Sequence, residues 1–190
     1  MAHKFNIKSK SKLDNEWRRE NLPPEATLLS LGLTPEDSMA DIGCGIGYFT
    51  IPGAQIVNNQ VFALDTSEEM LEEVNHRMGA AGLANLITLK TDEYDLKIPS
   101  ESVSFALLAL VLHEIDDKKR MITEIHRILK PEGRIAVIEW IKEDTEMGPP
   151  CAHRIGKEDV DALFTAEKFE RIDSKEFATV FYSSIFRAKT

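Results

Sequence analysis

The sequence has little cysteine and no long hydrophobic run. Its 190 residues include two cysteines, Cys44 and Cys151, too few to crosslink a domain of this size through a disulfide framework. The longest apolar run, 105–112, has eight residues, whereas a membrane-spanning helix needs about 20. The first residues are polar and lysine-rich, unlike the apolar stretch of a secretory signal. These absences predict a protein of the reducing cytoplasm, without a membrane partner.

An excess of positive charge is also missing. The chain carries 23 Lys and Arg against 32 Asp and Glu, for a net charge of −9. That balance argues against broad binding to nucleic acid, which requires basic surfaces. The first twenty residues are an exception, with six basic and three acidic side chains. We expect an N-terminal arm at 1–24, either solvated or lying over the site as a lid, followed by one domain at 25–190.

What the sequence does contain is a regular alternation of short apolar strands and amphipathic helices. The strands are expected at 38–42, 61–65, 86–89, 103–110, 135–140 and 179–187. The helices are expected at 25–32, 48–57, 67–81, 117–129 and 157–167. Such alternation is typical of the α/β class, in which a parallel sheet is covered by helices on both faces.

Several polar or small residues fall at the ends of the predicted strands. Asp41, Asp65, Ala109 and Trp140 all lie at or near a strand terminus. Open parallel sheets bind their ligands beyond the carboxyl ends of the strands. We therefore expect these four residues to converge on one ligand-binding edge.

A glycine-rich loop, DIGCGIG at 41–47, follows the first strand. Glycines at a strand-to-helix turn let a ligand approach backbone N–H groups at the start of a helix. The nicotinamide fingerprint G-x-G-x-x-G requires its third glycine at position 48, which is Tyr48. The phosphate loop G-x-x-x-x-G-K-[ST] is absent from the sequence. A purely structural tight turn remains an alternative.

Two carboxylates discriminate further between ligands. Asp41 lies close to the glycine loop, where it would repel a pyrophosphate and attract a cation. Asp65 ends the second strand, eighteen residues after Gly47, at a position where an acid holds ribose hydroxyls. A ligand with a ribose and a positive charge, but no phosphate, fits both acids.

With these residues, the sequence resembles the class I S-adenosylmethionine-dependent methyltransferases. The loop 41–47 matches their first motif, and Asp65 in FALDTSEEML matches their second acid. Further matches follow in family order: LKTDEYDLKIPSESVS, LLALVLHEI and EIHRILKPEGRIAVIEW. The resemblance runs from about residue 25 to 190, and both ends are similar to a small subgroup near the quinone-biosynthesis and small-molecule methyltransferases.

The resemblance implies a doubly wound, mostly parallel seven-stranded sheet with an antiparallel C-terminal strand. It also implies S-adenosylmethionine as cofactor, S-adenosylhomocysteine as product and no metal ion. The implied cofactor-binding residues are Asp41, Gly43, Cys44, Gly45, Gly47, Asp65, Thr66, Met70, Asp92, Glu93 and Ala109. Two departures from the family pattern, Lys97 and Ser104, are expected beside the adenine.

Methyl transfer from a sulfonium is an in-line displacement in which the protein mainly orients the reactants, so no catalytic side chain is obligatory. The best candidate for a general base is His113, after the fourth predicted strand; a histidine that merely packs a helix start is the competing interpretation. Glu114, Glu139 and His153 are weaker candidates, and a surface acid is the competing interpretation of Glu139.

Aromatic side chains could wall the pocket, because their faces attract sulfonium cations. The candidates are Trp140, Tyr48 and Phe5, although core packing is the commoner role. Cys151 with His153 suggests thiol or metal chemistry only weakly, since the two lack the spacing of metal ligands.

The sequence thus predicts methyl transfer from S-adenosylmethionine to a small-molecule acceptor. An S-adenosylmethionine-binding sensor or accessory subunit without turnover is the main alternative, and a nicotinamide-dependent oxidoreductase is a weaker one. The acceptor and the oligomeric state, including a homo-oligomer, stay open at this point.

Overall fold

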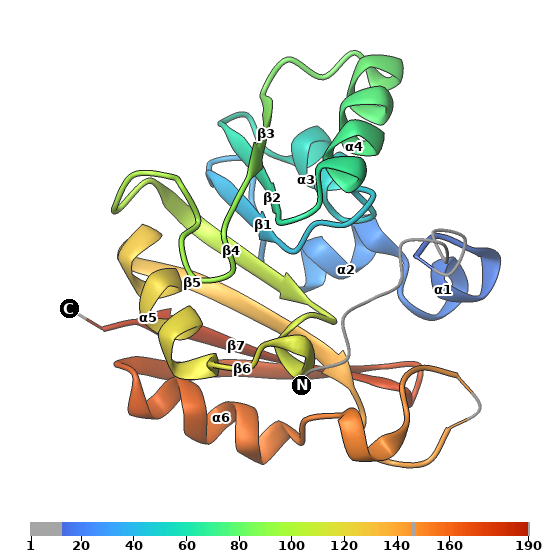
Figure 1. Cartoon of the computed structure of the whole chain (residues 1–190), viewed down its shortest axis with the longest axis vertical. Coiled ribbons are helices and arrows are strands. Elements are labelled where there is room, and N and C mark those ends of the chain that lie inside the picture. Colours follow the sequence, from blue (N-terminus) through green and yellow to red (C-terminus); the bar gives the residue numbers. More distant parts are fainter. Residues whose placement is uncertain (1–12, 146, 190) are drawn as a thin grey trace.

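The structure, a computed structural model, describes residues 13–145 and 147–189 and contains one sheet of seven strands in the order β3-β2-β1-β4-β5-β7-β6 (Figure 1). The strands are β1 Met39–Ile42, β2 Val61–Asp65, β3 Leu86–Lys90, β4 Val103–Ala109, β5 Leu129–Trp140, β6 Phe169–Phe177 and β7 Phe181–Ala188. Strands β1 to β5 run parallel, whereas β7 pairs antiparallel with both β5 and β6. The expected doubly wound, mostly parallel sheet is confirmed.

The helices cover both faces of this sheet. They are α1 Glu16–Asn21, α2 Pro24–Ser30, α3 Thr50–Ile56, α4 Glu68–Ala81, α5 Lys118–Ile128 and α6 Lys157–Ala166, with 3-10 turns η2 Leu112–Glu114 and η3 Cys151–His153. Figure 1 shows α2, α3 and α4 on one side of the sheet, and α5 and α6 on the other. No helix in the described ranges is long and apolar enough to cross a membrane.

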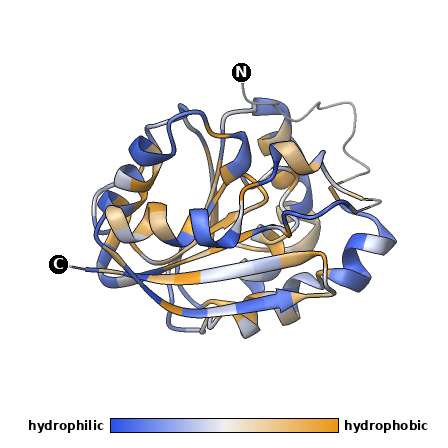
Figure 2. Ribbon diagram, turned by 90° about the horizontal axis from the view of Figure 1, so that it is seen from below, coloured by the Kyte–Doolittle hydropathy of each residue, from blue (hydrophilic) through white to orange (hydrophobic). Residues whose placement is uncertain are grey.

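Two hydrophobic cores, one on each face, fix the sheet between the helix layers. Because side chains alternate across a strand, Phe105 and Leu107 of β4 pack with α2, α3 and α4, while Ala106 and Leu108 pack with α5 and α6. Figure 2 shows hydrophobic segments mainly in the interior of the molecule and hydrophilic segments mainly at its outside, including the edge strand. Each large apolar side chain that is fully buried contributes about 1.5–3 kcal/mol to folding stability. The two cores therefore hold the strands, and the residues at their ends, in fixed positions.

Helix ends follow the local signals in the sequence. The Ser67 side chain accepts a hydrogen bond from the Met70 N–H at 3.4 Å, and α4 ends at Gly82, whose φ is +65°. The Asp117 side chain likewise accepts from the Arg120 N–H at 3.0 Å and starts α5. These caps satisfy backbone groups that the helix itself leaves unpaired. The boundaries of α4 and α5 are therefore close to those predicted.

Among the α-helices and strands of the described residues, two were not predicted from the residue pattern. Strand β6 has mostly exposed residues at the sheet edge, FERIDSKEF, and shows no clean apolar alternation. Helix α1 has six residues, EWRREN, which is less than two turns and too short for periodicity to reveal. Helix α1 lies within the expected N-terminal arm.

Candidate active site

A cavity of about 1380 Å³ opens along the carboxyl edge of the sheet. Asp41, Asp65, Ala109 and Trp140 all line it, as the positions of the strand ends predicted. Pockets for one small molecule usually measure roughly 300–1,000 Å³. This cavity therefore has room for a cofactor and a second molecule.

The glycine loop is held tightly against its neighbours. Gly43 has a φ of +69°, and a Cβ built on it would lie 2.6 Å from a methyl carbon of Val111. A side chain at this position would be both strained and obstructed. The Gly45 N–H donates to Asp65 Oδ2 at 2.9 Å, which ties the loop to the end of β2. Gly47 differs from the prediction because it does not line the cavity; it faces Val74 of α4, where a Cβ would lie 3.3 Å from a methyl carbon.

The Asp65 carboxylate organises the neighbouring backbone. Its Oδ1 accepts from the Ser67 N–H at 2.8 Å, while Oδ2 accepts from Gly45. Burial raises the pKa of Asp65, and the backbone N–H groups of Ser67, Gly45 and Thr66 oppose that rise only in part. A carboxylate has about four lone-pair sites. The Asp65 carboxylate can therefore still accept hydrogen bonds from hydroxyl groups of a ligand in the cavity.

Asp41 is a buried acid at the end of β1, with an exposed fraction of 3%. Its Oδ2 accepts from the Thr50 hydroxyl at 2.5 Å. Burial, together with the nearby charge of Asp65, raises the pKa of Asp41 to about 7, although Thr50 and Arg18 act in the opposite direction. A positively charged ligand would stabilise the ionised form of this buried carboxyl group.

A loop after β3 supplies Asp92 and Glu93 at one end of the cavity. Asp92 pairs with the Lys97 ammonium at 2.8 Å, and Glu93 accepts from the Tyr94 hydroxyl at 2.9 Å. The expectation that Ser104 lies beside this region is wrong. Ser104 is at the amino end of β4, on the opposite edge of the sheet, and its hydroxyl donates to Asp37 at 2.7 Å.

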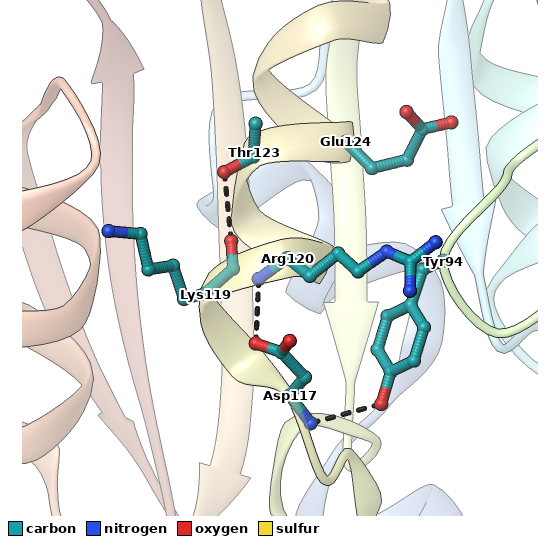
Figure 3. A pocket seen from close by; sticks show the side chains of 6 residues that line it. All are labelled: Tyr94, Asp117, Lys119, Arg120, Thr123 and Glu124. Carbon is teal, nitrogen blue, oxygen red and sulfur yellow. Dashed lines mark hydrogen bonds between the residues drawn. The ribbon is translucent and has the colours of Figure 1, made fainter.

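A second, smaller hollow lies behind this loop (Figure 3). The Asp117 N–H donates to the Tyr94 hydroxyl at 3.0 Å, and the Arg120 guanidinium lies 4.9 Å from the Tyr94 ring. These contacts tie the loop of Asp92 and Glu93 to the start of α5. The side chains around this hollow therefore hold the loop of Asp92 and Glu93 in place against α5.

The remaining predicted cofactor residues, Cys44, Thr66, Met70 and Ala109, also line the cavity. Cys44 is buried, and that burial raises the pKa of its thiol well above the usual value. The thiol is therefore not a nucleophile at neutral pH. Its small size suits the narrow turn.

His113 lies on η2 and lines the cavity, as predicted for a candidate base. Its Nδ1 lies 2.8 Å from Glu139 Oε2, and its backbone N–H donates to Glu139 Oε1 at 3.2 Å. Because a carboxylate only accepts, Nδ1 carries the proton in the neutral imidazole, and Nε2 then holds the lone pair. Burial opposes the imidazolium, but the hydrogen bond and charge of Glu139 outweigh it and raise the pKa of His113.

Glu139 is not a surface acid, because its exposed fraction is 0%. It belongs to β5, whose neighbours β4 and β7 cover both of its edges. An acidic residue in the apolar run IAVIEW was the one sequence signal that it is paired internally. Of the weaker candidate bases, Glu114 and His153 line the cavity, with Glu114 Oε1 3.8 Å from His113 Nε2.

The described part of the N-terminal arm lies on the cavity. The Trp17 and Trp140 rings stack with centroids 6.1 Å apart, and Asp14 pairs with Arg77 of α4 at 3.0 Å. The Arg18 guanidinium lies 4.4 Å from the Tyr48 ring. That contact places a protein cation against Tyr48, one of the aromatic side chains predicted to line the pocket. Phe5 lies outside the described residues, and movement of the arm as a lid stays a prediction.

Arg154 organises the loop after β5, which also lines the cavity. It donates to carbonyls of Pro149, Ile141, Glu143 and Met147 at 2.7–2.9 Å, and to the Thr145 hydroxyl at 2.8 Å. Gly148 of this loop packs on Trp140; its φ is +96°, and a Cβ there would lie 2.8 Å from the indole. No group of three or more potential metal ligands occurs in the described part of the chain.

The seven-stranded sheet, the glycine loop and the two strand-end acids define a class I S-adenosylmethionine-dependent methyltransferase. The methyltransferase domain family matches residues 40–137, just over half of the chain, and the protein belongs to that family. S-adenosylmethionine is accordingly its cofactor.

Known proteins support this assignment. A methyltransferase structure from Aquifex aeolicus, described as S-adenosylmethionine-dependent, superimposes with a TM-score of 0.92 at 26% identity, covering 97% of this chain and 99% of that one. A demethylmenaquinone methyltransferase of Symbiobacterium thermophilum is 32% identical over 111 residues, 57% of this chain and 44% of that protein. A ubiquinone/menaquinone biosynthesis C-methyltransferase of Marinomonas sp. is 25% identical over 134 residues, 69% of this chain and 51% of that protein. The chain thus spans about half the length of these curated relatives.

The raised pKa of Asp41 predicts that the ligand-free protein becomes less stable as the pH rises. Since folding raises this pKa to about 7, the native state favours the neutral acid. The associated stability is fully present below about pH 4 and is lost as pH rises toward 7. Near pH 8 we expect Asp41→Asn to have a free energy of unfolding about 2–4 kcal/mol greater than wild type, and therefore to melt at a higher temperature. The difference should shrink near pH 5. S-adenosylhomocysteine affinity should fall by about tenfold or more.

Thermal denaturation of both proteins without ligand, at the two pH values, measures the stability difference. Calorimetric titration with S-adenosylhomocysteine measures the affinity. An Asp41→Asn variant whose stability relative to wild type does not change with pH would contradict this description of Asp41.

The contacts of Arg154 predict a variant with a selective defect. Arg154→Lys keeps the charge but loses the planar group that joins five acceptors, so the residues that supply them in 141–145 and 147–149 should be held together less firmly. We expect the KM for the methyl acceptor to rise about tenfold and S-adenosylhomocysteine affinity to stay within about twofold. Arg171→Lys, at a half-exposed ion pair on β6, is the matched control. Equal losses for both ligands would contradict a role confined to the acceptor side.

Proposed function

We propose that this methyltransferase acts in the cytoplasm and methylates a ring carbon of a small, neutral hydroxylated aromatic molecule of the hydroquinone type. One observation carries the proposal: His113, oriented by the fully buried Glu139, lines the same cavity as an aromatic wall. The names of the menaquinone and ubiquinone methyltransferases related to this chain support the same acceptor class.

A base suits this chemistry because a neutral aromatic carbon is a weak nucleophile. Removal of a hydroxyl proton by His113 Nε2 sends electron density into the ring. The ring carbon then bonds to the methyl group while the S–CH₃ electron pair stays on sulfur as S-adenosylhomocysteine. The methylated ring tautomerises back to a hydroquinone, and His113 returns its proton to solvent. A positioned base accelerates such a step by roughly 10²–10⁴-fold.

The aromatic wall favours a flat acceptor. Trp17 of α1, Trp140 of β5 and Phe181 of β7 form a cluster, with the Trp140 and Phe181 centroids 4.5 Å apart. All three residues line the cavity. Aromatic rings recognise planar molecules through offset stacking and edge contacts, worth about 0.5–1.5 kcal/mol per pair.

The charges around this wall favour an acceptor without negative charge. Two basic side chains border the wall on the side of β5 and the loop after it: Lys142 lies 3.6 Å from the Asp159 carboxylate, and Arg154 is occupied by five acceptors of its own loop. A phosphorylated or carboxylated acceptor would have to break these pairings. A neutral hydroxylated ring would not.

The test is methyl transfer from labelled S-adenosylmethionine to a panel of reduced quinones, simple phenols, amines and thiols. We expect ring methylation of reduced quinones, detected by mass spectrometry as a C–CH₃ product. The oxidised quinones should be inert because their rings are electrophilic. Binding of S-adenosylhomocysteine without turnover on any of these acceptors would instead favour a sensor or accessory subunit.

The His113–Glu139 pair predicts a kinetic signature. In Glu139→Gln, the amide can donate to Nδ1, which shifts the ring proton to Nε2 and removes the base. We expect kcat to fall by about 10²–10³-fold with S-adenosylhomocysteine affinity unchanged. Since Glu139 raises the pKa of His113 against burial, any remaining rise of kcat/KM with pH should move to lower pH.

Glu143→Gln, on the exposed part of the neighbouring loop, serves as the control. His113→Asn should match Glu139→Gln in kcat, because the two residues act as one unit. Full activity of either variant on the best acceptor would rule out this base.

A further inference from the structure

We infer that Arg18, from helix α1, binds the α-carboxylate of S-adenosylmethionine, while Asp41 binds the α-ammonium of the same amino-acid group. The inference depends on the cofactor and is independent of the proposed acceptor. It assigns a cofactor contact to a residue that precedes the family-matched residues 40–137.

The position of Arg18 is the first argument. Its side chain lines the cavity next to the glycine loop. The guanidinium lies 4.4 Å from the centroid of the Tyr48 ring, and its Nη1 donates to the Leu13 carbonyl at 3.0 Å. Leu13 in turn reaches the loop: a Cβ on Gly45 would lie 3.5 Å from Leu13 Cδ1. Arg18 is therefore at the end of the cavity where the glycine loop and Asp41 lie.

Its hydrogen bonding is the second argument. Nε of Arg18 is buried and has no hydrogen-bond partner among the described residues. Burying a donor of a charged group without an acceptor is costly. Burial lowers the pKa of Arg18, and the charges of Tyr48, Asp14 and Asp41 offset this only in part. An anionic ligand with two oxygens would satisfy the planar guanidinium.

The third argument is the pairing with Asp41. Each of the two groups acts on the charge of the other, so an acid and a guanidinium of opposite sign lie at one end of the cavity. S-adenosylmethionine carries an ammonium and a carboxylate on a single carbon. The protein thus presents a complementary charge for each half of this zwitterion.

Helix α1 is held firmly enough to position Arg18, although it has only six residues. The Asn15 side chain caps it by accepting from the Arg18 N–H at 2.8 Å, and Asp14 pairs with Arg77 of α4 at 3.0 Å. The Tyr48 hydroxyl donates to the Leu22 carbonyl at 2.8 Å, just after the helix. These contacts join the segment around α1 to the residue that follows the glycine loop and to α4.

Decarboxylated S-adenosylmethionine is a direct probe, because it keeps the sulfonium, the ribose and the ammonium and lacks only the carboxylate. Calorimetric titration, without any methyl acceptor, compares it with S-adenosylmethionine on wild type and on Arg18→Gln. We expect wild type to prefer S-adenosylmethionine by about 10- to 100-fold. Arg18→Gln should lose that preference by weakening S-adenosylmethionine alone, with the decarboxylated ligand changed by less than about threefold.

Arg19→Gln is the matched control. Arg19 follows on the same helix, its side chain is 58% exposed, and it pairs with Asp14 at 2.6 Å. This variant should keep the wild-type preference. Arg18→Lys, which retains charge without the planar fork, should show an intermediate preference.

Equal weakening of both ligands in Arg18→Gln would assign Arg18 a structural role and overturn the inference, as would no weakening of either. Should Arg18→Gln fail to fold, wild type and Arg18→Lys still decide: equal affinity of wild type for the two ligands overturns the inference. The absence of methyl transfer to hydroquinones would overturn the proposed acceptor and leave these binding results untouched.

Discussion

Two carboxylates at the ends of adjacent parallel strands determine what this sheet binds. Asp65 accepts backbone N–H groups from the glycine loop and from the residue before α4, so it joins the two turns that border the cavity. Asp41, one strand away, is buried deeply enough to have a raised pKa. Together they make the edge unfavourable for a pyrophosphate and favourable for a sulfonium nucleoside, although the loop has the same strand–glycine–helix form as a dinucleotide site.

The cavity is built by two parts of the chain with different contributions. Residues 40–137, matched by the family, supply the glycine loop, both strand-end acids and His113. The flanking segments supply the aromatic wall and the ordered loop around Arg154, and they meet where Trp17 stacks on Trp140. A common core that binds the cofactor and variable flanks that shape the remaining space explain how one fold can serve many acceptors.

The predictions from the sequence were most accurate where neighbouring residues alone determine the structure. Ser67 and Gly82 mark the ends of α4 through their own hydrogen bonding and φ angle, so the helix could be placed closely. Strand β6 escaped because an exposed edge strand needs no apolar alternation. The position of Ser104 and the surface alternative for Glu139 were wrong because both depend on pairing between distant segments. The start of β4 lies opposite the ligand edge, and β5 is covered by β4 and β7.

The buried Glu139 also accounts for the charge balance of the proposed reaction. Methyl transfer turns a cationic sulfonium into a neutral thioether, so an acidic cavity loses the cation that it favoured. If the acceptor proton passes to His113, the positive charge moves to the imidazolium instead of leaving the site. Glu139, 2.8 Å from Nδ1, is then its counter-charge in a region of low dielectric. The same contact that raises the pKa of His113 thereby stabilises the charge distribution that develops as the methyl group is transferred.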